Sequence, residues 1–255
     1  MTLARPAGLV LALCVAPGPA LAGAWPTPKG ETQVIVKYED QRADEGFDPN
    51  GERLPLLAQR VDREASIFVE HGLTDSLTLQ LKGAWQQGRD AFVDYEGRGP
   101  VEIGLRWRAW SDERRVVSLY AGHVAAGEGR NAGYAAPGEG DGDWELRVLG
   151  GAAVEVIGRP GWLELQAARM FRSGGLRDET RLDATAGLHL TNNWTTLAQA
   201  YGGVADDDGP AWLHVEASVV RRFGDWSLQA GWRETVYGRE VAASSGPVVA
   251  VWRRF

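Results

Sequence analysis

The feature that most constrains the fold is a strict alternation of apolar and polar side chains over stretches of about ten residues. Such stretches occur at 77–86, 101–110, 144–155, 182–190, 213–219 and 226–232. This period and length are typical of a strand that crosses an outer membrane with one face toward lipid and the other toward a lumen. No run of 18 apolar residues follows residue 25, so the sequence predicts no transmembrane helix.

The connections between these stretches alternate between short and long. Short turns are expected at 72–76, 111–114, 157–161, 191–193 and 224–225, and polar loops, mostly longer, at 41–59, 89–98, 126–142, 173–177, 205–210 and 238–245. Eleven connections join twelve strands. With an even number of strands, the first strand begins and the last strand ends on the short-turn side, which faces the periplasm in outer-membrane barrels. The sequence therefore predicts an all-β fold, a transmembrane up-and-down antiparallel β-barrel of about 12 strands.

The strand ranges that satisfy this count are 31–40, 60–71, 76–88, 99–110, 115–125, 143–156, 161–172, 178–190, 194–204, 211–223, 226–237 and 246–255. The strands at 161–172 and 194–204 alternate less cleanly, which leaves a tolerance of two strands. The last strand ends in Phe255, as outer-membrane barrels commonly do. Arg253 shares the lipid-facing side of that strand, at a cost of roughly 0–1 kcal/mol near an interface.

Tryptophan, with 11 copies, supports two membrane interfaces. Trp110, Trp162, Trp194 and Trp226 lie beside short turns, whereas Trp85, Trp144 and Trp212 lie near long loops. Ordinary core packing in a soluble β-barrel or sandwich is the alternative. Strand length, loop asymmetry and the N-terminal segment favour the membrane barrel.

Residues 1–22 have the organisation of a secretory signal peptide, and residues 23–255 form the predicted barrel domain. Arg5 supplies the positive charge, a short apolar stretch follows, and Ala20–Ala22 is a small-x-small site before Gly23. Leu13 is too large for lipid attachment at the following Cys14. As the single cysteine, Cys14 excludes a disulfide framework and a multi-cysteine metal site.

The charged residues of the alternating stretches are expected to line the lumen, because Arg or Lys facing lipid at the midplane costs roughly 2–4 kcal/mol. These candidates are Lys82, Glu102, Arg106, Arg108, Glu145, Arg147, Glu155, Arg181, Asp183, His189, His214, Glu216, Arg222 and Arg233. One interpretation is a self-neutralised salt-bridge network that closes the barrel. The other is a narrow polar conduit whose arginines favour anions. Twelve strands lie between the filled eight-stranded and the water-filled sixteen-stranded barrel, so both remain open.

No arrangement of residues predicts catalysis or a cofactor. His214 and Ser218 share a strand and lie about 13 Å apart at about 3.3 Å per residue, too far for direct proton transfer. The acidic segments at 206–209 and at Asp141 and Asp143 are interpreted as solvated loops in preference to calcium sites. The net charge of −7, without a dense basic cluster, argues against nucleic-acid binding.

The segment Glu70–Leu79 (EHGLTDSLTL) resembles the "YGLTDxLTL" hairpin of an outer-membrane barrel family described as transporters or as the phenol-degradation meta-pathway type. The segments 47–52 and 103–112 are similar to the first loop and the next strand and turn of that family. His71 stands where the family usually has Tyr. The resemblance implies a passive or substrate-selective pore for small, often hydrophobic or aromatic compounds, and it supplies no catalytic residue.

Together these features predict a monomeric channel or transporter in the lipids of the outer membrane, with loop 126–142 folding over its mouth and a small solute as its cargo. The lumen charge sets selectivity in this hypothesis. A lipid- or protein-modifying barrel enzyme, a hydrolase or transferase centred on His189 or His214, is the first alternative. A closed structural or adhesive barrel that works through its acidic loops is the second.

Overall fold

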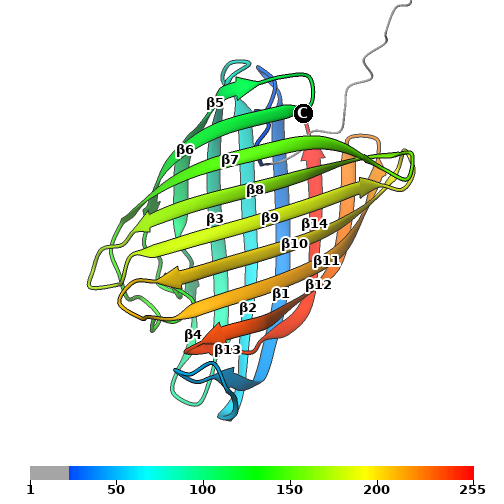
Figure 1. Ribbon diagram of the computed structural model, residues 1–255. Helices are drawn as coiled ribbons and strands as arrows, with labels where there is room; N and C mark the ends of the chain where they lie inside the picture. The colour runs from blue at the N-terminus through cyan, green and yellow to red at the C-terminus, as the bar shows by residue number, and fades with distance from the viewer. Residues whose placement is uncertain (1–22) are drawn as a thin grey trace, which may run out of the picture.

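The strands close into a barrel in the computed structural model, which describes residues 23–255; the predicted signal peptide at 1–22 lies outside these residues (Figure 1). The strands are β1 (Thr32–Phe47), β2 (Arg53–Gly72), β3 (Leu77–Arg89), β4 (Asp94–Arg98), β5 (Val101–Ser111), β6 (Arg115–Ala125), β7 (Asp143–Val156), β8 (Arg159–Phe171), β9 (Glu179–His189), β10 (Trp194–Ala205), β11 (Ala211–Phe223), β12 (Trp226–Arg239), β13 (Val241–Ala242) and β14 (Ser245–Arg254). All pairings between them are antiparallel, and β1 pairs with both β2 and β14, which closes the sheet. No helix among residues 23–255 is long and apolar enough to cross a membrane.

Two of the wall strands are interrupted. β4 and β5 both pair with β3, but Trp85 is opposite Arg98 whereas Lys82 is opposite Glu102, so the register shifts by one residue across Gly99 and Pro100. A bulge accommodates the extra residue and the missing N–H of proline. β13 and β14 likewise form one interrupted strand along β1. The described residues therefore build a wall of twelve strands, and the predicted number is confirmed.

The beginning of β1 and the end of β14 both lie on the short-turn side, as predicted. The Thr32 amide donates to the carbonyl of Phe255 at 3.2 Å. Figure 1 shows the C-terminus at the same end as the β5–β6 turn, with the β1–β2 hairpin at the opposite end. The long connections lie at that opposite end, which is the extracellular side in an outer membrane.

The predicted loop 41–59 is mostly strand. β1 and β2 continue to pair beyond the alternating region, with a register shift between Ala43 and Glu45, and the chain turns only at 48–52. There the Asp48 carboxylate accepts hydrogen bonds from the amides of Asn50 and Glu52 at 2.8 Å each. Part of the predicted loop 89–98 is the short strand β4. Both extensions lie toward the extracellular end, where a strand has no lipid-facing side and the alternation disappears.

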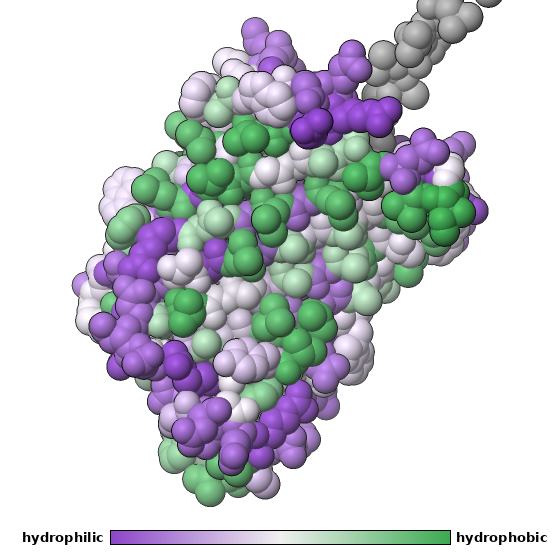
Figure 2. All heavy atoms as spheres, viewed as in Figure 1, coloured by the Kyte–Doolittle hydropathy of each residue, from purple (hydrophilic) through white to green (hydrophobic). Residues whose placement is uncertain are grey.

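The outer face of the wall is an apolar belt. Ile103, Leu146 and Trp232 are each more than half exposed, which is the expected state of side chains that face lipid. Figure 2 shows hydrophilic residues gathered at the end with the long loops and apolar ones over the wall. Arg253 faces outward as predicted, with its guanidinium 4.6 Å from the Trp226 ring centre.

The prediction that the tryptophans near turns and loops form two interfacial levels is partly wrong. Trp85, Trp110, Trp144, Trp194 and Trp226 are exposed on the outside, as interfacial residues should be. Trp162 is instead buried inside the barrel against Leu197 and Val220, and Trp212 lines the lumen. A position near a turn does not determine on which face of the strand a residue lies, and the alternation places these two side chains on the inward face.

Candidate channel lumen

A cavity of about 1140 Å³ occupies the barrel interior. It is lined by inward-facing side chains of nearly every wall strand, and it reaches the short-turn end at residues 158–160 and 190–193. The two-residue period of each strand sends its polar side chains into this space while its apolar side chains face outward.

Nine of the fourteen predicted lumen residues line the cavity: Lys82, Glu102, Arg147, Arg181, Asp183, His189, Glu216, Arg222 and Arg233. Four more lie on the inward phase without lining it, namely Arg106, Arg108, Glu145 and His214. Arg106 and Glu145 are fully buried. Arg108 is opposite Ser118, a buried inward residue.

Glu155 is the exception. It has the inward phase of β7 but lies one residue from the end of the strand, where the side chain is exposed. The turn at Ile157 and Gly158 follows at once, and both residues adopt left-handed φ angles of 52° and 69°. Glu155 therefore lies outside the cavity lining, because the wall ends before the residue is enclosed.

A network of ion pairs lies along one side of the lumen, on β5, β7 and β9. Arg147 binds Glu145 and lies 3.7 Å from Glu102, which also accepts a short hydrogen bond from the Tyr120 hydroxyl. Arg181 is shared between Glu145 at 3.5 Å and Glu179 at 2.5 Å. The buried carboxylates lie at the wall and hold the guanidinium groups at the edge of the cavity.

A second ion-pair cluster lies on the opposite side of the barrel. Arg233 binds Glu39 at 2.9 Å and Glu216 at 2.7 Å, and its guanidinium lies 4.8 Å from the Tyr201 ring centre. The Gln229 amide donates a further hydrogen bond to Glu216 at 3.1 Å. Both clusters neutralise charge as the closed-network interpretation requires, yet the cavity persists between them.

The extracellular end of the lumen is covered by a third cluster, which we call the roof: Arg172, Asp143, Glu179 and loop 126–142. Arg172 binds Asp143 at 3.2 Å and Glu179 at 3.1 Å, and all three side chains are at most 5% exposed. Its guanidinium also donates to the Asn131 carbonyl of the loop at 2.9 Å. Asp143 is thus a buried ion-pair partner, and its interpretation as a solvated loop residue is wrong.

Loop 126–142 spans the mouth between strands that are far apart around the barrel. Arg130 binds Asp90 of the β3–β4 connection at 2.7 Å, while the Tyr134 hydroxyl donates to the Arg177 carbonyl of the β8–β9 connection. Burial opposes ionisation of Asp90, but hydrogen bonds from the Phe92 and Val93 amides and the charge of Arg130 hold its pKa below the ordinary value. The loop folds over the mouth, as predicted.

The periplasmic end is partly filled by a segment that the sequence did not predict to be inside. Residues 23–28, which we call the plug, enter the barrel and pack against the inner wall. Ala24 is fully buried with Val116, Tyr120 and Leu149. The Trp25 ring occupies the space over Gly151, where a Cβ atom would approach it to 2.5 Å. A short segment with two prolines beside the predicted cleavage site carries no periodic signal, so alternation cannot detect it.

Four polar contacts hold the plug by its backbone. The Ser118 hydroxyl donates to the Ala24 carbonyl at 2.6 Å, and Arg106 donates to the Trp25 carbonyl at 2.8 Å. The Thr27 amide donates to Thr78 Oγ1 at 3.0 Å, and the Ala24 amide donates to Glu164 Oε2 at 2.9 Å. Arg106 is itself held by a buried ion pair with Glu70 at 2.6 Å.

The interior histidines have hydroxyl partners. His189 Nδ1 is 2.8 Å from Thr195 Oγ1, and His214 Nδ1 is 2.9 Å from Thr235 Oγ1. These contacts supply no orienting carboxylate of the kind that a catalytic triad uses. No group of three or more metal-ligating side chains occurs among residues 23–255.

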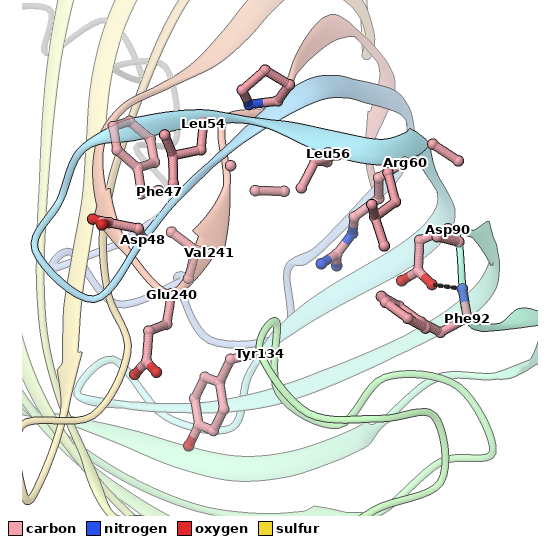
Figure 3. Close-up of a pocket in the computed structure, with 16 residues that line it drawn as sticks. Phe47, Asp48, Leu54, Leu56, Arg60, Asp90, Phe92, Tyr134, Glu240 and Val241 are labelled. Atoms are coloured by element: carbon pink, nitrogen blue, oxygen red, sulfur yellow. Dashed lines mark hydrogen bonds between the residues drawn. The ribbon is translucent and has the colours of Figure 1, made fainter.

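A smaller apolar pocket of about 340 Å³ lies outside the roof, at the extracellular ends of β1 and β2 (Figure 3). Phe47, Leu54 and Val241 lie on one side of it, and Phe92 and Tyr134 on others. Phe92 is 83% exposed, although it belongs to a connection expected to be polar. No sequence pattern predicts this pocket, because its residues come from separate connections.

Searches of protein-family models and of curated proteins find no match to this chain. Solved structures do match. An outer membrane channel from Pseudomonas putida F1, with 14% identity and a TM-score of 0.73, covers 92% of this chain and 99% of its own. The NanC porin gives 8% identity and a TM-score of 0.57 over 86% and 98%, and the KdgM porin 9% and 0.55 over 87% and 99%.

The similarity to these structures supports the assignment of the fold, and the apolar belt supports the location in a membrane. A closed wall whose outer side chains are Leu, Val, Ile and Trp is stable only where lipid covers it. The chain is an outer-membrane β-barrel, and its fold is that of solved outer-membrane channels and porins.

Proposed function

We propose that this protein is a monomeric outer-membrane channel for small polar solutes and that it prefers anions. The observation that carries the proposal is the charge of the cavity lining: eight Lys or Arg residues against four Asp or Glu residues. Glu145 and Glu179 balance part of this charge from behind the guanidinium groups, but both are at most 1% exposed. A solute in the cavity therefore meets more cations than carboxylates.

Lys82 offers the sharpest test, because its side chain is exposed toward the cavity from the middle of β3. Reversal potentials should be measured in a KCl gradient across a planar bilayer containing the purified barrel. We expect Lys82→Glu to shift the reversal potential toward cation preference. Arg114→Glu makes the same charge change at an exposed periplasmic turn and should leave the potential unchanged.

A silent bilayer with a correctly inserted barrel, or equal shifts in the two variants, would overturn the proposal. The solved relatives support it only by analogy: one similar structure is described as the KdgM porin in complex with disordered oligogalacturonate, which is an anionic oligosaccharide.

A second candidate is passage of small apolar compounds. The apolar pocket formed by Phe47, Leu54 and Phe92 favours it, as does the resemblance of residues 70–79 to the transporter or phenol-degradation family. This candidate predicts low ion conductance together with binding of a nonpolar fluorescent probe that Phe92→Ser weakens.

A further inference from the structure

Glu164 is the exception among the buried carboxylates of the barrel. Within residues 23–255, seven carboxylates are buried, and six of them form ion pairs with Lys or Arg: Glu39, Glu70, Asp143, Glu145, Glu179 and Glu216. Glu164 is 6% exposed and forms no ion pair in the described chain. Its two oxygens accept hydrogen bonds from the Ala24 amide and the Gln166 side chain. A buried carboxylate with only neutral donors is costly unless a cation accompanies it.

The group that faces Glu164 is the first residue of the plug. A Cβ atom added to Gly23 would lie 1.8 Å from Glu164 Oε2 and 2.2 Å from Oε1. Nitrogen and Cβ are bonded to the same Cα, so the Gly23 nitrogen lies at most about 4 Å from this carboxylate. A side chain at this position would displace the Glu164 carboxylate, and Gly23 has a φ of +114°, a value that favours glycine.

We propose that Glu164 binds the α-ammonium group of Gly23, which is created when an endopeptidase hydrolyses the Ala22–Gly23 bond. The hydrolysis consumes one water and leaves a carboxylate on Ala22 and an amine on Gly23. An α-amine has an ordinary pKa near 7.7–8.0, so it is mostly protonated at neutral pH. The new charge supplies the cation that Glu164 lacks, and the ion pair latches the plug to β8.

This chemistry makes the latch depend on processing. Before cleavage, the Gly23 nitrogen is a neutral amide, which offers Glu164 one hydrogen and no charge. After cleavage it offers three hydrogens and a positive charge, and charge-assisted hydrogen bonds are about twice as strong as neutral ones. Removal of residues 1–22 is part of this proposal.

The test measures the Gly23 amine directly and does not depend on conductance. Protein purified from outer membranes is first weighed intact, and we expect a chain that begins at Gly23. It is then labelled with an amine-reactive reagent at neutral pH in its folded form. Lys29, which is exposed, is the internal reference. We expect the Gly23 amine to label at least tenfold more slowly than after denaturation, and Glu164→Gln to remove most of that protection.

Two variants separate the latch from a general loss of structure. Glu155→Gln removes an exposed carboxylate from the neighbouring strand and should keep the protection. Gly23→Ala places a Cβ atom against Glu164 and should lose it, while the barrel still migrates as a heat-modifiable band. An N-terminus elsewhere than Gly23, or equal labelling of wild type and Glu164→Gln, overturns the proposal. A barrel that conducts no ions still passes or fails this test, so the channel proposal is judged separately.

Discussion

The two ends of the lumen are obstructed by different means. At the periplasmic end, the plug is a stretch of backbone that other elements hold through its amides and carbonyls, beside a small apolar cluster around Ala24. At the extracellular end, the roof is built on Arg172, whose carboxylate partners belong to the neighbouring strands β7 and β9. The plug is a separate segment of chain, whereas Arg172, Asp143 and Glu179 of the roof lie at the ends of wall strands.

The difference decides which end opens at lower cost. If the plug leaves, Arg106 keeps its ion pair with Glu70, and water that enters the vacated space can solvate Ser118, Thr78 and the cavity-lining carboxylate of Glu164. If the roof opens at Arg172, a guanidinium and two carboxylates lose partners in a buried setting, and breaking such a pair costs about 3–5 kcal/mol. Opening for solute passage is therefore expected at the plug, with loop 126–142 moving over an intact Arg172 cluster.

Deleting residues 23–28 behind the signal peptide should have the largest effect. The apolar contacts of Trp25 and the backbone bonds of Ala24 disappear together, and the cavity then opens across the β5–β8 side of the periplasmic mouth. We expect single-channel conductance to rise at least severalfold. Deleting Asp207 and Asp208, which lie in an exposed extracellular turn, is the control and should leave conductance unchanged. Unchanged conductance in the plug deletion would show that the roof, not the plug, limits passage.

Arg172→Ala should have the largest effect on stability. It leaves Asp143 buried without its cation and removes one of the two partners of Glu179. We expect a loss of about 3–5 kcal/mol in the free energy of unfolding, measured by urea titration of the barrel in micelles. Arg169→Ala, three residues earlier and on the outer face of β8, removes partly exposed pairs with Asp178 and Asp206 and should cost much less stability. Similar losses in both variants would remove the distinction between wall and surface ion pairs.

The sequence predicts the wall much better than what closes it. Alternation gives the twelve strands and the inward phase of residues such as Arg147 and Arg233, because lipid on one side and polar groups on the other impose a period of two. The plug has no such constraint: its position depends on complementary surfaces at Gly151 and Glu164, far away in the chain. Asp143 and Arg172 are 29 positions apart, and only strand register reveals that they meet.

The smallest expected effect concerns loop 126–142 of the roof and the dependence of its ordering on pH. The pKa of Asp90 lies below its ordinary value, because the Phe92 and Val93 amides and Arg130 outweigh the opposing effect of burial. A carboxyl with a lowered pKa in the folded state contributes stability above its unfolded pKa, near 3.9, and this contribution is lost as pH falls through the folded value. Ordering of loop 126–142 should therefore be constant from pH 7 to 5 and decrease below about pH 4.

Hydrogen exchange of loop 126–142, corrected for the intrinsic effect of pH, measures this change. Asp90→Asn keeps the shape of the side chain but cannot form the ion pair with Arg130, so its loop should exchange faster at pH 6 and show no acid step from this residue. Protection of the Ala24 amide at pH 6 should be the same in both proteins, because Asp90 lies at the other end of the barrel. A simultaneous loss of protection at plug and loop would mean that the two closures open together, and the distinction between them would fail.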